Sequence, residues 1–123
     1  MKPANNHGLK RIFRATGFSF KGLSAAWKHE AAFRQELILA ILMLPVALLV
    51  NVSVPEKLLM IFTLFLVLIV ELLNSAIEAV VDRISDEIHP LSGRAKDIAS
   101  AAVFLSLCLC GLTWAAILLP LLF

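Results

Sequence analysis

A 24-residue apolar stretch, 58–81, constrains the fold of this chain more than any other feature of its sequence. As an α-helix it would measure about 36 Å, enough to cross the roughly 30 Å hydrocarbon core of a bilayer. Two glutamates are the only charged residues inside it, and a turn containing Pro55 precedes it. The stretch therefore predicts a transmembrane helix.

Two other segments have the same apolar character. The run 37–50 would reach only about 21 Å by itself, so we expect its helix to continue back to Ala31. The segment 98–122 contains no charged residue. Hydrophobic residues make up 60% of the chain, against roughly 45–50% in soluble domains. We therefore predict an all-α integral membrane protein, a single membrane domain over 1–123 with transmembrane helices at 31–50, 58–81 and 98–122.

The segment 9–29 is amphipathic. Its two helical faces hold these residues: Leu9, Ile12, Phe13 and Thr16 on the apolar face, and Lys10, Arg11 and Arg14 on the basic face. This pattern is typical of a helix that lies in the membrane surface. Gly17 and Gly22 permit a bend or a break in it, and Trp27 suits the aromatic belt at the membrane surface.

Basic residues are unevenly distributed along the chain. Seven of the eleven fall within the first 34 positions, and three more lie in the polar connection 82–97. The positive-inside rule therefore places the N-terminus and this connection in the cytoplasm and the C-terminus outside. A basic segment joined directly to apolar spans also argues against nucleic acid as a partner.

Polar side chains form one stripe along the second predicted span. They follow one another at helical spacing: Glu71, Asn74, Ser75, Glu78 and Asp82. A charged side chain within a bilayer costs roughly 2–3 kcal/mol or more. Several such groups on one face therefore indicate a shared polar cavity that serves chemistry or transport.

The two glutamates of the stripe would lie about 10 Å apart along the helix axis, too far to bind one small ion together. We expect Glu71 to act as a base and Glu78 as a metal ligand. Magnesium binds through one or two carboxylates plus substrate phosphates, and phosphoryl transfer also needs cations near the phosphates. Glu30 would supply a second carboxylate, and Lys96 and Arg94 the positive charge.

The stripe by itself leaves two other interpretations open. Its carboxylates can pair with Asn74, Ser75 or a neighbouring subunit and so fix the register of the helices. Alternatively, Glu71 can carry protons in a small proton-coupled transporter. The sequence contains neither a GxxxxGK[ST] loop nor a GxGxxG turn after a strand, so neither common nucleotide cradle identifies ATP.

The stretch 71–82, ELLNSAIEAVVD, closely resembles the signature E-x-x-N-S-A-x-E-x-x-V-D of the prokaryotic diacylglycerol kinase family. The resemblance extends to EAAFRQE at 30–36 and to LSGRAKD at 91–97. It implies a homotrimeric helical bundle in the bacterial inner membrane, with active sites shared between subunits. Such an enzyme transfers the γ-phosphoryl group of MgATP to diacylglycerol and produces phosphatidic acid.

The resemblance also implies a role for individual residues. Glu71 would be the catalytic base, and Glu30 and Glu78 would hold Mg²⁺. Nucleotide contacts would come from Arg11, Phe18, Glu30, Asn74, Glu78, Glu87, His89, Lys96 and Asp97. Contacts to the lipid substrate would come from Arg11, Trp27, Arg34, Glu71 and Ser100.

The sequence departs from the family pattern at two positions. Phe18 stands where members often carry tyrosine, which removes a hydroxyl group, and Pro90 replaces an acidic residue. Both changes concern nucleotide contacts. Undecaprenol kinases of the same family also phosphorylate a lipid alcohol, and they remain the alternative enzyme.

Overall fold

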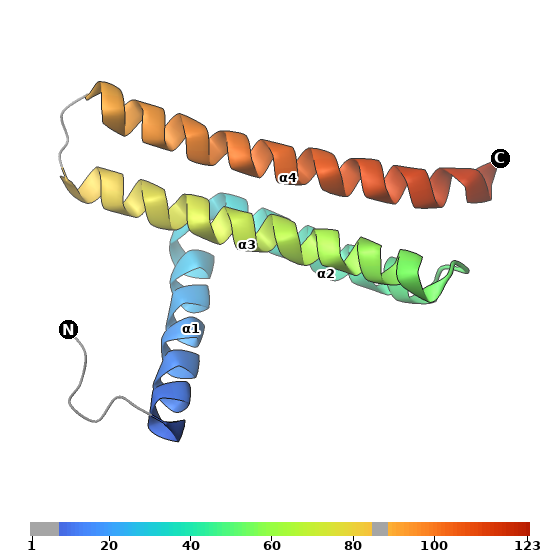
Figure 1. Cartoon of the computed structure of the whole chain (residues 1–123), viewed down its shortest axis with the longest axis horizontal. Coiled ribbons are helices and arrows are strands. Elements are labelled where there is room, and N and C mark those ends of the chain that lie inside the picture. Colours follow the sequence, from blue (N-terminus) through green and yellow to red (C-terminus); the bar gives the residue numbers. More distant parts are fainter. Residues whose placement is uncertain (1–7, 85–88) are drawn as a thin grey trace.

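The computed structural model describes residues 8–84 and 89–123, and it is helical almost throughout them. The helices are α1 (Leu9–His29), α2 (Ala31–Leu49), α3 (Val54–Ile84) and α4 (Pro90–Leu122). Figure 1 shows α2, α3 and α4 running side by side along the long axis, with α1 standing across them. Within the described residues the predicted all-α chain is confirmed.

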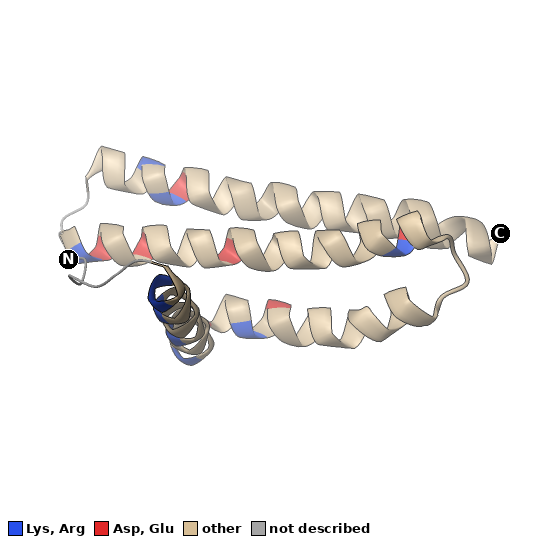
Figure 2. Ribbon diagram, turned by 60° about the horizontal axis from the view of Figure 1, so that its bottom comes forward, with Lys and Arg blue, Asp and Glu red and all other residues tan. Residues whose placement is uncertain are grey.

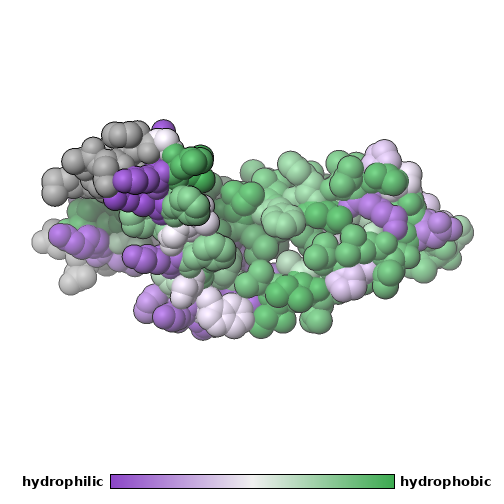
Figure 3. All heavy atoms as spheres, turned by 90° about the horizontal axis from the view of Figure 1, so that it is seen from below, coloured by the Kyte–Doolittle hydropathy of each residue, from purple (hydrophilic) through white to green (hydrophobic). Residues whose placement is uncertain are grey.

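The three long helices are apolar enough to cross a membrane by length and composition. On the face drawn in Figure 3, hydrophobic residues cover the middle of these helices, and hydrophilic residues gather around α1 and at the opposite end of the bundle. Large apolar side chains point outwards, and Leu112, for example, is 70% exposed. A surface of this kind requires an apolar environment, which the predicted bilayer provides. The surface location of α1 and the homotrimer remain predictions.

The helices pack around α3, which contacts α2 on one side and α4 on the other. One buried apolar cluster joins all three, and it consists of Ala47, Met60, Leu64, Val67, Cys110, Trp114 and Ile117. The indole nitrogen of Trp114 donates to the Met60 carbonyl and to Thr63 Oγ1, each at 3.2 Å. This cluster lies in the half of the bundle that contains the α2–α3 turn.

The α2–α3 turn is held by capping contacts. Glu56 Oε1 accepts hydrogen bonds from the backbone nitrogen of Ser53 at 3.1 Å and from its hydroxyl group at 2.7 Å. This arrangement starts α3 at Val54. Lys57 Nζ donates to the Leu48 carbonyl at 2.7 Å and satisfies the end of α2.

The first helix is continuous, and it does not break at Gly17 or Gly22 as the sequence allowed. Both glycines keep helical backbone geometry, because the only glycine with positive φ among the described residues is Gly8. The chain changes direction instead at Glu30, whose φ of −116° and ψ of 104° are extended. The corner between α1 and α2 is therefore one residue long.

The prediction that residues 82–97 form a polar connection between two helices is wrong for most of this segment. Helix α3 continues to Ile84, and α4 already begins at Pro90. Proline suits the first turn of a helix, and His89 Nδ1 accepts a hydrogen bond from the Leu91 backbone nitrogen at 3.1 Å. The second half of the segment is therefore helical. Residues 85–88 lie outside the described residues.

Candidate active site

The polar stripe of α3 forms a connected chain of side chains. Glu71 is only 3% exposed. Asn74 Nδ2 donates to Glu71 Oε2 and to Glu78 Oε1, each at 3.2 Å. Ser75 Oγ lies 3.5 Å from Glu71 Oε2. The amide group of Asn74 thus fixes the orientation of both glutamates. Figure 2 shows that acidic positions recur along α3 towards its end at Ile84.

A second carboxyl group reaches Glu71 from a different helix. The carboxyl group of Glu36, on α2, lies close enough to the Glu71 carboxyl group for the two to interact directly. The sequence analysis did not assign Glu36 to the site, because spacing along one helix does not show which residue of a neighbouring helix faces it.

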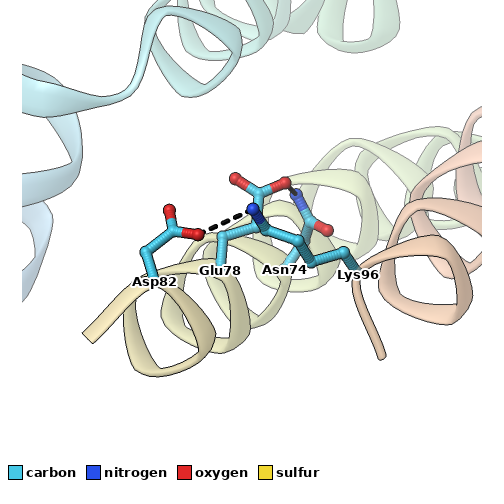
Figure 4. Close-up of polar contacts among 4 residues, drawn as sticks. All are labelled: Asn74, Glu78, Asp82 and Lys96. Carbon is cyan, nitrogen blue, oxygen red and sulfur yellow. Dashed lines mark hydrogen bonds and ion pairs between the residues drawn. The ribbon is translucent and has the colours of Figure 1, made fainter. Parts of the chain in front are cut away.

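The outer end of the stripe is joined to α4. Lys96 Nζ lies 2.7 Å from Asp82 Oδ1, and the same ammonium group also interacts electrostatically with Glu78. Figure 4 shows Asp82, Glu78 and Asn74 on α3 with the Lys96 side chain reaching them from α4. The predicted phosphate-binding cation therefore lies beside a predicted metal ligand.

Glu30 lies at the corner between α1 and α2, and its side chain lines a pocket of about 680 Å³ between α1 and α3. The α3 wall of this pocket includes Ser75 and Ala79, so it is formed by residues next to the stripe. Small residues line the α1 wall, among them Gly22 and Ala26. The structure therefore brings Glu30 to the face of α3 that carries Ser75.

The donor set suits magnesium better than a metal that needs a closed protein site. Among the described residues no three His, Cys, Asp or Glu side chains form a metal-binding group. Mg²⁺ needs only one or two carboxylates when phosphates and water complete its shell, and Glu30 and Glu78 are carboxylates. In the described structure Asn74 Oδ1 is buried without a hydrogen-bond partner, so the stripe contains an additional oxygen acceptor.

Other predicted nucleotide contacts occupy α4 and α1. Asp97 lines a second hollow, of about 500 Å³, together with Arg94, and His89 caps the start of α4. Phe18 is exposed on α1, where Lys21 Nζ lies 5.7 Å from its ring centroid. Arg11 is also exposed on α1, and Glu87 lies outside the described residues. No hydrogen bond or ion pair between these side chains and the stripe is seen in the described part of the chain.

The predicted lipid contacts lie at two places. Trp27 is 43% exposed near the end of α1, and Ser100 is exposed on α4. Arg34 Nη1 donates to the backbone carbonyls of Trp27 at 2.7 Å and of Lys28 at 3.2 Å. The guanidinium group of Arg34 is thus already engaged at the α1–α2 corner.

Comparison with known proteins identifies the family. A family profile described as prokaryotic diacylglycerol kinase matches residues 17–118. The chain is 58% identical over 112 residues to a diacylglycerol kinase of Pseudomonas aeruginosa, with 91% of each chain covered. It is 51% identical over 114 residues to one of Escherichia coli, with 93% of each covered. The chain belongs to the prokaryotic diacylglycerol kinase family.

Further members of the prokaryotic diacylglycerol kinase family match at lower identity. A diacylglycerol kinase of Haemophilus influenzae is 48% identical over 111 residues, which cover 90% of this chain and 94% of that protein. The family profile includes the stripe, Glu30 and Lys96, whereas Arg11 lies before its first matched residue. The sequence-based prediction of a kinase of this family is confirmed.

Proposed function

We propose that this chain transfers the γ-phosphoryl group of MgATP to the hydroxyl group of diacylglycerol and releases phosphatidic acid at the cytoplasmic surface of the membrane. The observation that carries the proposal is the connected series from buried Glu71 through Asn74 to Glu78, which ends beside Lys96. It links a base within the membrane to the charged groups at the membrane surface. Family membership supports the same reaction.

Glu71 is the proposed base. It lies within the apolar span, where a lipid hydroxyl can approach, and Asn74 and Ser75 orient its carboxylate. As the lipid oxygen forms a bond to the γ-phosphorus, its proton passes to Glu71. The bond from that phosphorus to the β–γ bridging oxygen breaks, and ADP leaves with the electron pair. A positioned base typically accelerates such steps by about 10²–10⁴-fold.

Glu30 and Glu78 would hold Mg²⁺, which neutralises developing charge on the phosphates during transfer. Glu78 is oriented by Asn74 at 3.2 Å, and Glu30 is presented from the α1–α2 corner. Lys96 supplies a further positive charge next to Glu78. Catalysis would then rest on positioning and electrostatic stabilisation, with no covalent intermediate on the protein.

The remaining predicted residues surround this centre. For the nucleotide we propose contacts from Asn74 of the stripe and from Asp97 of α4. The outer nucleotide contacts would be Arg11, Phe18, Glu87 and His89. For the lipid we propose Trp27, Arg34, Ser100 and Arg11 around the head group, with the acyl chains remaining in the bilayer. The location that fits these roles is the bacterial inner membrane, with the N-terminus in the cytoplasm.

A homotrimer with shared active sites is part of the proposal. The three long helices leave large apolar side chains exposed, including Leu42, Phe65 and Leu112. Copies of the chain can cover part of this surface in the membrane. A neighbouring copy would also bring further side chains to the open pocket between α1 and α3.

The decisive experiment is a kinase assay on the purified protein in detergent with radiolabelled ATP. Dioleoylglycerol and undecaprenol are supplied in parallel, and the Glu71→Gln variant is the control. We expect labelled phosphatidic acid at a rate at least about tenfold above labelled undecaprenyl phosphate. Preference for undecaprenol would assign the chain to the alternative enzyme. Phosphorylation of neither alcohol, together with proton flux in proteoliposomes, would support the transporter.

A further inference from the structure

The end of α1 is closed by a side chain from α2. A helix leaves its last four carbonyl groups without donors from the same helix. The Ala26 carbonyl accepts from the Glu30 backbone nitrogen at 2.9 Å. The next two carbonyls, those of Trp27 and Lys28, accept from Arg34 Nη1 at 2.7 and 3.2 Å.

Arg34 therefore acts on both sides of Glu30. Its backbone nitrogen donates to the Glu30 carbonyl at 3.2 Å and begins α2, while its side chain ends α1. Both hydrogen bonds come from one nitrogen, Nη1, which belongs to a planar and permanently charged guanidinium group. Its charge also lies at the negative end of the α1 dipole.

Among the residues that the structure describes, little else fixes the direction of α1. Its main contacts are with α2, and a pocket of about 680 Å³ separates it from α3. Figure 1 shows α1 leaving the bundle at this corner. A small change in the angle at Glu30 would therefore move the whole of α1 and turn the Glu30 carboxylate relative to Ser75 and Ala79.

We propose that Arg34 is a positioning residue that locks the α1–α2 corner and so holds Glu30 where it can ligate the nucleotide-bound metal ion. The proposal rests on the proposed function in one respect, the metal-binding role of Glu30. This role replaces the contact with the lipid head group that was proposed for Arg34 above, because the guanidinium group is already bonded to two backbone carbonyls.

The test uses the full-length protein in lipid nanodiscs. Arg34→Gln removes the charge and shortens the side chain, Arg34→Lys keeps the charge without the planar guanidinium group, and Arg83→Gln removes an equivalent charge from the last turn of α3. Amide hydrogen exchange is measured over residues 23–30. The affinity for Mn²⁺, a spectroscopic substitute for Mg²⁺, is measured by electron paramagnetic resonance with a non-hydrolysable ATP analogue.

For Arg34→Gln we expect exchange over residues 23–30 to be about fivefold faster and Mn²⁺ affinity to fall about tenfold, as for other lost partners of metal ligands. The KM for dioleoylglycerol should stay within about twofold of the unmodified protein. Arg34→Lys should lie between the two, since it keeps the positive charge at the end of α1 but places it on a freely rotating ammonium group instead of a planar guanidinium group. Arg83→Gln should match the unmodified protein in exchange and in Mn²⁺ affinity.

Unchanged exchange in Arg34→Gln would overturn the proposal. A raised KM for dioleoylglycerol with unchanged Mn²⁺ affinity would also overturn it and make Arg34 a lipid contact. The Glu30→Gln variant tests the metal role of Glu30 separately from the positioning role of Arg34. If Glu30→Gln leaves Mn²⁺ affinity unchanged, the metal role in the proposed function is wrong. If Glu30→Gln weakens Mn²⁺ binding and Arg34→Gln does not, the positioning role alone is wrong.

Discussion

Glu36 and Glu71 bring two carboxyl groups together across the contact between α2 and α3. Glu36 Oε2 is also buried, with no hydrogen-bond partner in the described part of the chain. In this arrangement Glu36 steadies the proposed base from a second helix.

The first prediction concerns this pair. Glu36→Gln keeps a polar side chain that can donate to Glu71, so we expect kcat to stay within about threefold of the unmodified enzyme. Glu36→Leu removes this polar neighbour and should lower kcat at least about tenfold, equivalent to about 1.4 kcal/mol in activation free energy. Initial rates at saturating MgATP and dioleoylglycerol measure both. Equal rates for the two variants would show that a polar side chain at position 36 is irrelevant to turnover.

Glu71→Gln tests the base directly. The amide keeps the size of the side chain and accepts from Asn74, but it does not take a proton at neutral pH. We expect kcat to fall by at least about 100-fold, with the same oligomer size in size-exclusion chromatography. Turnover within a factor of about three of the unmodified enzyme would exclude Glu71 as the base.

Glu78→Gln tests the metal ligand. Loss of one of two carboxylates should raise the Mg²⁺ concentration needed for half-maximal rate by about tenfold or more. Glu56→Gln is the matched control, because Glu56 caps α3 at the opposite end of the helix. The test measures the rate against Mg²⁺ concentration for the unmodified enzyme, Glu78→Gln and Glu56→Gln. Superimposable curves for Glu78→Gln and Glu56→Gln would count against ligation.

The fourth prediction separates two roles of Lys96. It is ion-paired with Asp82 at 2.7 Å, so Lys96→Met removes both that pair and the proposed phosphate contact, whereas Asp82→Asn removes only the pair. An exposed ion pair contributes about 0–1 kcal/mol. We therefore expect the KM for ATP to rise at least about tenfold in Lys96→Met and less than about threefold in Asp82→Asn. Similar KM values in both variants would reduce Lys96 to a structural partner.

The fifth prediction concerns stability alone. Trp114→Phe removes the indole donor that reaches the Met60 carbonyl and Thr63. Buried bonds of this kind contribute about 0.6–2 kcal/mol in membrane proteins, so the unfolding temperature in detergent should fall while specific activity stays unchanged. Trp27→Phe is the comparison, since Trp27 is far more exposed. An equal fall in both variants would show that the hydrogen bonds contribute nothing.

The helices of this fold could be read from the sequence where the signal was local. The run 58–81 and the polar stripe on it are properties of one helix, and both appear as expected in α3. The sequence analysis assigned residues 90–97 to a polar connection. A proline at the helix start and a histidine cap make this part helical.

Contacts between helices could not be predicted from the sequence. Glu36 reaches Glu71 only because of how α2 is rotated against α3, and a spacing pattern within one helix contains no information about that rotation. The same holds for Arg34, which the family resemblance assigned to the lipid substrate and which bonds to the carbonyls of Trp27 and Lys28. Packing of the whole chain decides such pairings.

The apolar cluster around Met60 and Trp114 occupies the half of the bundle opposite the acidic stripe. The residues that hold the helices together are thus separate from those assigned to phosphoryl transfer. Substitutions in the half that contains the acidic stripe can therefore change which alcohol is accepted without removing the contacts of the apolar cluster. An engineer can do the same by leaving the far half of the bundle untouched.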